Sequence, residues 1–230
     1  MQSGACPSNS HLLRPRLLAV FDLDGTITRH DTLIQYVLGY LKSRPWRLFG
    51  FLLALPAVLL YALGRSDRGA LKGAVMHWTL GGSSRHDLDQ WTARFVPRLL
   101  ENGVFRQAMD QIAEHKRNGD VLVLMSASPD LYVPAIARHL GFTEATCTGV
   151  RWHGDRFDGR LTTENCRGPE KVRRFGELRA RHAGLPSAAY GNADSDIDHL
   201  RLADRGVLVN GNERTRQRAV GVGVACESWQ

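Results

Sequence analysis

A short apolar run that ends in acidic residues constrains the fold of this chain most. Leu17 to Phe21 is a run of consecutive apolar residues, and Asp22-Leu23-Asp24-Gly25-Thr26 follows it directly. A run this short and this apolar is typical of a parallel strand that is buried on both faces. The sequence therefore predicts an α/β protein in which a buried strand ends at a loop that carries two carboxylates.

Two later segments repeat this arrangement. Val121 to Met125 ends at Ser126-Ala127-Ser128-Pro129, and Ala188 to Tyr190 ends at the polar cluster from Gly191 to Asp196. One more strand is expected at 207–209, and a β-hairpin at 149–161. Helical patterns cover residues 105–117, 130–140 and 169–182. We therefore expect a doubly wound parallel sheet, which brings small polar and acidic residues to the edge where such sheets bind ligands.

The segment from 32 to 100 interrupts this alternation and has an all-helical pattern. Its residues 48–63 are apolar and uncharged, with arginines on both flanks. This run is short of the ~20 residues that a spanning helix needs, and Pro56 would kink it. We expect an interfacial or re-entrant helical hairpin. A buried cap helix is the alternative, although the run is apolar on all sides and a small cap has little interior.

The expected organisation has three parts. Residues 1–16 form a polar tail, interpreted as disordered rather than as a signal peptide because no small-residue cleavage site follows. Residues 17–31 and 101–230 form the catalytic core. Residues 32–100 form an inserted helical cap, with 48–63 as its membrane-seeking segment. Four scattered cysteines with no CxxC pair favour a reducing compartment and argue against a zinc ribbon.

The charge of the chain favours an anionic partner. The formal net charge is +7 and the isoelectric point is near 9.6. Such a charge suits nucleic acid, a membrane surface or a phosphorylated substrate. No helix-turn-helix, zinc-finger or RNP-like pattern accompanies the basic residues, so nucleic acid is not the expected partner. The sequence predicts no oligomeric state.

The first strand end offers a nucleophile and an acid–base group. Phosphate esters hydrolyse so slowly that an enzyme must supply a nucleophile, a counter-charge and a proton donor together. Asp22 can attack phosphorus and form an aspartyl-phosphate. Asp24 can protonate the leaving oxygen and then activate the hydrolytic water. Gly25 lets the chain turn sharply beside the phosphate, and Thr26 can donate a hydrogen bond to it.

The later strand and helix ends offer the remaining parts of a phosphate site. Ser126 is placed to bind a phosphoryl oxygen, together with the backbone N–H groups that begin at Ala127. Lys171 follows Pro169 at a helix start and can bring positive charge against both the phosphate and Asp22. Each feature alone is common in proteins, where a serine usually caps a helix and a lysine is usually solvated. Their order along the chain makes phosphate chemistry the better interpretation.

A magnesium site is expected beside the nucleophile. Its oxygen ligands would come from Asp22, the backbone carbonyl of Asp24 and the cluster that contains Asn192 and Asp196, with Asp194 as an alternative. Magnesium is favoured because these ligands are hard oxygens with no histidine or cysteine among them. The neutral amide of Asn192 weakens the charge that would hold the ion.

These motifs resemble those of the haloacid dehalogenase superfamily. The first is Asp22-Leu23-Asp24-Gly25-Thr26, the second Ser126, the third Lys171 and the fourth Gly191 to Asp196. The resemblance implies a Rossmann-like core, an aspartyl-phosphate intermediate and Mg²⁺. In that superfamily an acid at the position of Asp24 marks phosphatases rather than ion-pumping ATPases. A cap between the first two motifs places the chain in the phosphoserine-phosphatase-like branch.

Within that branch, the apolar run and Asn165 to Val172 look similar to phosphatidylglycerophosphatase C, a family of bacterial lipid phosphatases. The resemblance implies hydrolysis of phosphatidylglycerophosphate to phosphatidylglycerol at the cytoplasmic face of the inner membrane. The basic side chains Arg65, Arg68, Lys72 and Arg85 could meet a headgroup phosphate there. A soluble small-molecule phosphatase, such as phosphoserine phosphatase, remains the alternative, and a non-catalytic lipid-phosphate-binding protein remains a third hypothesis.

Overall fold

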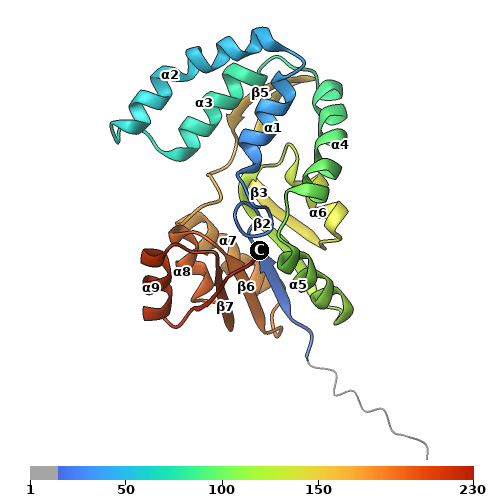
Figure 1. Ribbon diagram of the computed structural model, residues 1–230, viewed down its shortest axis with the longest axis vertical. Coiled ribbons are helices and arrows are strands. Elements are labelled where there is room, and N and C mark those ends of the chain that lie inside the picture. Colours follow the sequence, from blue (N-terminus) through green and yellow to red (C-terminus); the bar gives the residue numbers. More distant parts are fainter. Residues whose placement is uncertain (1–14) are drawn as a thin grey trace, which may run out of the picture.

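The computed structural model describes residues 15–230 of the chain (Figure 1). The tail predicted over residues 1–16 lies outside the described residues, except for its last two positions. The strands are β1 (Leu18–Phe21), β2 (Val121–Pro129), β3 (Glu144–Thr148), β4 (Val150–His153), β5 (Arg156–Leu161), β6 (Ser187–Gly191), β7 (Arg205–Val209) and β8 (Ala225–Glu227). The helices are α1 (Thr32–Leu41), α2 (Phe49–Ala62), α3 (Arg68–Leu80), α4 (Arg85–Asn102), α5 (Arg106–Arg117), α6 (Val133–Leu140), α7 (Pro169–Arg181), α8 (Ile197–Leu200) and α9 (Glu213–Gly221), with a 3₁₀ turn, η1 (Pro45–Leu48), before α2.

The core is a six-stranded sheet with the order β3-β2-β1-β6-β7-β8. Each pairing in it is parallel. The central strand is β1, whose last residue, Phe21, pairs with Leu124 on one side and Tyr190 on the other. Because parallel strands all end at the same edge, Asp22 emerges between the ends of β2 and β6. The predicted doubly wound α/β fold is confirmed.

The composition of β1 follows from its position. All four of its residues are buried, and they alternate between two hydrophobic clusters. Ala19 and Phe21 face one cluster, whereas Leu18 and Val20 face the other, as the period of two in a strand requires. The ring of Phe21 stacks on that of Tyr190 with centroids 4.3 Å apart. The strand that leads to Asp22 is therefore held on both faces and both edges.

The structure differs from the sequence prediction in three of the strands. β2 continues through Ser126 to Pro129, where the sequence predicted that it ends at Met125. The segments β3 and β8 were not predicted, because β3 is polar and mostly half-buried and β8 has only three residues. Neither shows the alternating or continuous apolar pattern by which strands are recognised.

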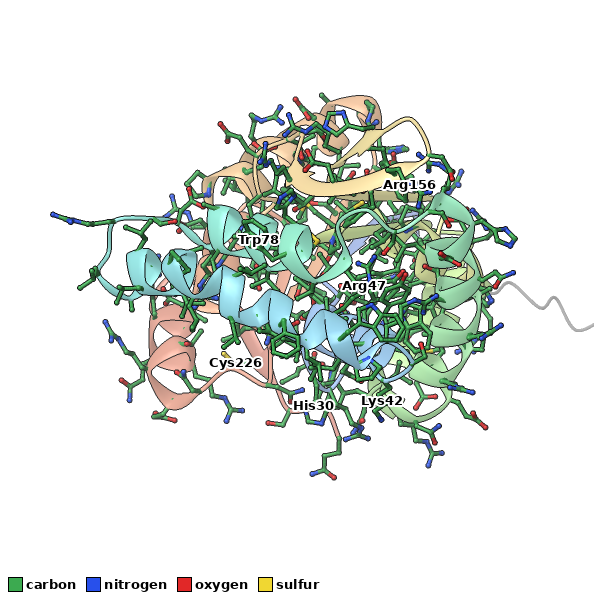
Figure 2. All side chains as sticks on the ribbon, turned by 90° about the horizontal axis from the view of Figure 1, so that it is seen from above. His30, Lys42, Arg47, Trp78, Arg156 and Cys226 are labelled. Carbon is green, nitrogen blue, oxygen red and sulfur yellow. The ribbon has the colours of Figure 1, made fainter. Side chains whose placement is uncertain are left out.

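Helices α1 to α4 and the antiparallel β4–β5 hairpin lie beyond the carboxyl edge of the sheet (Figure 1). α3 packs against β5, and α2 lies along α3 (Figure 2). The two helices approach closely at Gly50, where a Cβ atom would lie 2.1 Å from the carbonyl oxygen of Trp78. Arg47 reinforces this contact, since its guanidinium donates to the carbonyl oxygens of Thr79 (3.1 Å) and Gly81 (3.0 Å).

Most of α2 is exposed. Only Gly50 and Ala54 of its residues are buried, whereas Phe49, Leu52 and Leu59 are 69%, 59% and 60% exposed. The alternative of a buried cap helix is therefore wrong. Within the described residues, η1 and α2 together form one segment, Pro45–Ala62, that is long and apolar enough to cross a membrane as judged by length and composition alone.

Candidate active site

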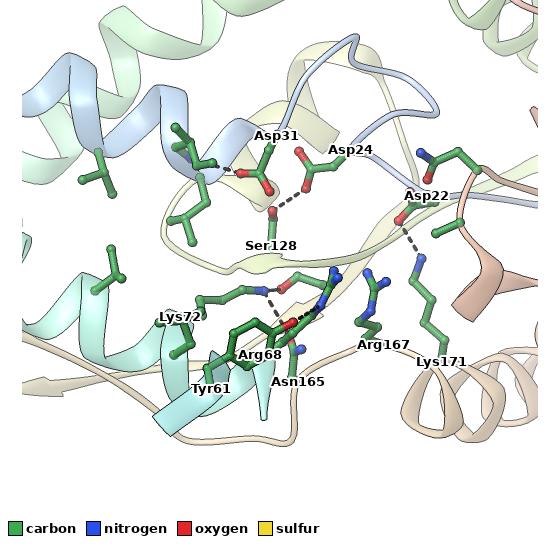
Figure 3. A pocket seen from close by; sticks show the side chains of 18 of the residues that line it. Asp22, Asp24, Asp31, Tyr61, Arg68, Lys72, Ser128, Asn165, Arg167 and Lys171 are labelled. Atoms are coloured by element: carbon green, nitrogen blue, oxygen red, sulfur yellow. Dashed lines mark hydrogen bonds and ion pairs between the residues drawn. The ribbon is translucent and has the colours of Figure 1, made fainter. Parts of the chain in front are cut away.

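A cavity of about 660 Å³ lies between the carboxyl edge of the sheet and helices α1 to α3 (Figure 3). One end is polar and the other apolar. The polar end is lined by Asp22, Asp24, Ser128, Lys171, Asn192 and Asp196. The apolar end is lined by Leu33, Ile34, Val37, Leu38, Phe51, Val58, Leu71 and Val75, which come from the three cap helices.

Asp22 is fixed by backbone and side-chain contacts at the end of β1. Its N–H donates to the carbonyl oxygen of Tyr190 (2.9 Å), which extends the β1–β6 pairing by one residue. One carboxylate oxygen accepts from Nζ of Lys171 (2.6 Å), and the other accepts from Oγ1 of Thr26 (3.2 Å). The side chain is buried at the cavity floor, so the predicted nucleophile is held in a single orientation.

Lys171 joins two carboxylates. It lies in the first turn of α7, and its Nζ also donates to Oδ1 of Asp196 (2.8 Å). Burial lowers the pKa of Lys171, but the charges of Asp196 and Asp22 outweigh burial and raise it above its usual range. The lysine therefore remains a cation at neutral pH and supplies the counter-charge expected from the sequence.

The two carboxylates that share Lys171 have pKa values shifted in opposite directions. Burial raises the pKa of Asp22 to about 6, against the opposing charge of Lys171. Burial also acts on Asp196, but Lys171 and the N–H groups of the surrounding loop hold the pKa of Asp196 at about 2. Asp196 is therefore ionised at neutral pH. The site stabilises the ionised form of Asp22 less strongly than that of Asp196.

Asp24 occupies a separate environment. Its carboxylate accepts from Oγ of Ser128 (2.6 Å) and from the backbone N–H of Thr32 (2.6 Å) at the start of α1. Burial and the charge of Asp31 raise its pKa, and these two hydrogen bonds oppose that shift. A carboxyl group with a raised pKa suits the acid–base role expected for Asp24.

The polar cluster after β6 divides between the inside and the outside of the site. Oδ2 of Asp196 accepts from the backbone N–H groups of Asn192 (3.2 Å) and Ala193 (3.0 Å), and Asn192 lines the cavity. Asp194 instead pairs with Arg218 at 2.6 Å on the exposed surface. The structure therefore brings Asn192 and Asp196 to Asp22 and leaves Asp194, the alternative ligand, outside.

Gly25 lies in close contact with the loop after β6. Its φ is +80°, and a Cβ atom on it would lie 2.0 Å from Nδ2 of Asn192. Only glycine can adopt that conformation without strain and leave room for the amide. The turn after β1 and the loop after β6 are thus packed together, and Thr26 is fully buried beneath them.

The second strand end differs in detail from the sequence prediction. Ser126 is fully buried, its Oγ accepts from the N–H of Ser128 (3.0 Å), and its side chain does not line the cavity. Ala127 does line it, and its carbonyl oxygen accepts from Lys72. Sequence reasoning missed Ser128, although it lies two residues after Ser126 and so on the same side of the strand. It also missed the cavity residues Asp31, Asn165 and Arg167.

Residues 19–201 match the sequence pattern of the haloacid dehalogenase-like hydrolases. The chain belongs to this family. Relatives among characterised sequences include protein CicA of Caulobacter vibrioides, which is 32% identical over 207 residues, or 88% of this chain and 90% of CicA. Another is a probable phosphatase of Mycobacterium tuberculosis, which is 26% identical over 211 residues and covers 90% of this chain and 73% of the relative.

Solved structures are similar to this one along nearly the whole chain. A protein of unknown function from Bordetella pertussis Tohama I has a TM-score of 0.76 at 22% identity and covers 92% of this chain and 98% of its own. A substrate-bound phosphoserine phosphatase has a TM-score of 0.65 at 14% identity and covers 93% of both chains. These similarities establish a shared fold.

The donors in this haloacid dehalogenase-like site fit magnesium. The described residues contain no cluster of three or more His, Cys, Asp or Glu side chains that could enclose a metal ion. Mg²⁺ needs no such cage, because it is commonly held by one or two carboxylates and keeps several waters. Asp22 and Asp196 supply two buried carboxylates and Asn192 an amide oxygen, all at the polar end of the cavity.

Proposed function

We propose that this hydrolase is a phosphatase that moves a phosphoryl group from a phosphomonoester to Asp22 and then to water. An Asp22 oxygen attacks phosphorus as the ester P–O bond breaks, and Asp24 gives its proton to the leaving oxygen. Water then attacks the aspartyl-phosphate and gives a proton back to Asp24. This second step releases inorganic phosphate and restores the Asp22 carboxylate.

The contacts within the site support each of these roles. Lys171 holds the Asp22 oxygen in place and faces the developing charge. Ser128 and Thr32 orient Asp24 toward the same cavity. We propose Asp22, Asp196, Asn192 and the backbone carbonyl of Asp24 as the Mg²⁺ ligands. Bound there, the ion would neutralise negative charge on the phosphoryl oxygens.

The proposal for the substrate rests on the observation that one cavity contains both the polar end and the apolar end. Asp22 lies at one end, and apolar side chains from α1, α2 and α3 line the other, although α2 and α3 also contribute Tyr61, Arg68 and Lys72 to the cavity wall. A small polar ester such as phosphoserine would leave that apolar end without a partner, whereas a lipid chain would fill it. The proposed substrate is therefore a lipid phosphomonoester, and within that class phosphatidylglycerophosphate.

The exposed surface of α2 supports a location at the membrane. Large apolar side chains cover this surface, namely Phe49, Leu52, Leu53, Leu55, Leu59, Leu60 and Leu63. Soluble proteins rarely expose so many apolar side chains side by side. We propose that α2 rests in the headgroup layer at the cytoplasmic face of the inner membrane, so that a lipid enters the cavity between α1 and α2.

The test is phosphate release from a panel of monoesters. Phosphatidylglycerophosphate and phosphatidic acid are presented in the same detergent micelles, and phosphoserine and p-nitrophenyl phosphate in solution, with Mg²⁺ or with EDTA. We expect Mg²⁺-dependent release that is fastest from the lipids, with Asp22→Asn as the blank. Efficient hydrolysis of phosphoserine with none of either lipid would overturn the lipid proposal and favour the soluble alternative.

Binding to vesicles tests the location separately. The full chain is mixed with vesicles of phosphatidylglycerol and phosphatidylcholine and centrifuged through a density gradient. We expect the protein to float with the vesicles at physiological salt. Protein that stays at the bottom of the gradient contradicts membrane docking but leaves the hydrolytic mechanism intact.

A further inference from the structure

Three cationic side chains line the cavity apart from Lys171. Arg68 and Lys72 come from α3, and Arg167 comes from the loop before α7 (Figure 3). Among the described residues, no carboxylate forms an ion pair with any of the three. Arginines elsewhere on the core, such as Arg173 and Arg218, do have carboxylate partners.

The hydrogen bonds of these side chains leave donors free. Nζ of Lys72 donates to the carbonyl oxygen of Ala127 and to Oδ1 of Asn165 (3.0 Å), so one of its three protons has no partner. Nε of Arg68 donates to the hydroxyl of Tyr61 (3.0 Å), and no other described residue accepts from its two terminal nitrogens. These contacts orient Lys72 and Arg68 without pairing either with a carboxylate.

Lys72 and Arg167 also repel each other. Burial lowers the pKa of Lys72, and the charge of Arg167 adds a smaller decrease. The charges of Asp24 and Asp31 act in the other direction, but neither carboxylate is close enough to form an ion pair with Lys72. A group of cations in this state is stabilised by an anion that enters the cavity.

The position of the group separates it from the scissile phosphate. Lys171 already supplies the cation at Asp22. In the view of Figure 3, Arg167 appears between Lys171 and Arg68, and Lys72 on cap helix α3 lies farther from Asp22. In that view the three cations thus lie on the side of Lys171 that faces the cap helices.

We propose that Arg68, Lys72 and Arg167 bind a second anionic group of the substrate, a phosphodiester that joins the scissile monoester to the apolar part. This inference rests on the proposed function and assigns the residues by which the site would distinguish a lipid with both a phosphomonoester and a phosphodiester from one with the monoester alone. An arginine fork and a lysine point charge from two different elements suit the two non-bridging oxygens of a diester.

The test compares two lipids with the same acyl chains in the same micelles. Phosphatidylglycerophosphate carries both groups, whereas phosphatidic acid carries only the monoester. For Arg167→Gln and Arg68→Gln, we expect kcat/KM for the first lipid, divided by kcat/KM for the second, to fall about tenfold or more. Arg167→Lys should restore part of the ratio. Arg214→Gln, at an exposed position on α9, is the matched control and should leave it unchanged.

Equal losses on both lipids would overturn the proposal, because the cations would then serve the scissile phosphate or the fold. An unchanged ratio would overturn it as well. A soluble assay separates this outcome from failure of the lipid proposal. Glycerophosphoglycerol, a diester without a monoester, should inhibit p-nitrophenyl phosphate hydrolysis competitively in the wild type and about tenfold more weakly in Arg167→Gln. Absence of inhibition in the wild type would overturn the second-anion site even if lipids are cleaved.

Discussion

The polar end of the cavity and the surface of α2 differ in how many contacts their side chains make within the chain. At the polar end, Asp22, Asp24 and Asp196 each accept at least two hydrogen bonds from fixed donors. On α2, most side chains contact little, and the helix is joined to α3 through the close approach at Gly50. The carboxylates of the first region therefore find hydrogen-bond donors within the chain, whereas the second region exposes apolar side chains without such partners.

This difference separates two functions. Chemistry at phosphorus needs groups held to within fractions of an ångström, which buried and paired side chains on a rigid sheet supply. Choice of a lipid needs apolar area more than fixed geometry. Substitutions at the polar end should therefore affect all substrates alike, and substitutions on α2 should affect lipids alone.

The largest expected effect is the loss of the nucleophile. Asp22→Asn keeps the size of the side chain but removes its nucleophilic oxygen, so kcat should fall by about 10⁴ or more on lipid and soluble esters alike. The measurement is phosphate release at saturating substrate, with circular dichroism to show that the protein is folded. Asp194→Asn, which alters only the exposed pair with Arg218, should retain nearly full activity. Comparable activity in both variants would remove Asp22 from the mechanism.

A smaller but still general effect is expected at Ser128. Ser128→Ala removes the hydroxyl that donates to Asp24 at 2.6 Å. Hydrogen bonds to charged groups are worth about 1.5–3 kcal/mol, so kcat should fall roughly 10- to 100-fold on every monoester. Steady-state kinetics on p-nitrophenyl phosphate check this. Ser43→Ala is the control, because that exposed hydroxyl contacts only the carbonyl oxygen of Tyr40 and the side chain of Arg44, neither of which lines the cavity. A loss confined to lipid substrates would contradict the assignment of Ser128 to the chemical step.

A selective effect is expected on α2. In the double variant Leu52→Gln with Leu59→Gln, two exposed apolar side chains become polar without touching the cavity. The ratio of lipid to p-nitrophenyl phosphate turnover should fall about tenfold, since each buried side chain contributes about 1.5–3 kcal/mol to insertion when fully transferred and less when partly transferred. Val220→Gln, an equally exposed position on α9, is the control. An unchanged ratio would contradict the prediction that substitutions on α2 affect lipid substrates selectively.

The smallest effect is on stability. Gly50→Ala places a Cβ atom 2.1 Å from the Trp78 carbonyl oxygen, so α2 must move away from α3 at a cost of about 1–3 kcal/mol. Thermal unfolding should show a midpoint lower by several degrees. Gly176→Ala in α7 meets open space and should be neutral or stabilising by up to about 1 kcal/mol. Equal midpoints for the two variants would contradict the close helix contact.

The sequence predicted the fold and the position of Asp22 at the end of a buried strand because both depend on local pattern. A continuous apolar strand that ends in Asp22 leaves few alternatives, and Lys171 follows a recognisable helix start. The positions of Ser126 and Ser128 were harder to predict, because they depend on where β2 ends. Backbone pairing with β3 determines that end. Asp194 and Asp196 could not be separated either, since the short 3₁₀ turn that faces one inward and the other outward has no sequence signal.

The exposure of α2 also could not be predicted from the sequence. An apolar helix has the same composition whether its partner is a protein core or a lipid layer. What decides the outcome is that α3 covers only one side of α2, where Gly50 and Ala54 are buried. A hydrophobicity pattern indicates that an apolar helix favours contact with apolar groups, but it does not indicate whether those groups belong to a protein core or to a lipid layer.

The central position of β1 has a consequence for synthesis of the protein. Phe21 pairs with Leu124 and Tyr190, so its second neighbour is made 169 residues later. At translation rates of about 5–20 residues per second, that interval lasts roughly 10 to 30 s. α2 is synthesised early in this interval, before either neighbour of β1, and β6 is synthesised at its end. The nascent chain thus carries its exposed apolar helix well before the residues around Asp22 can assemble.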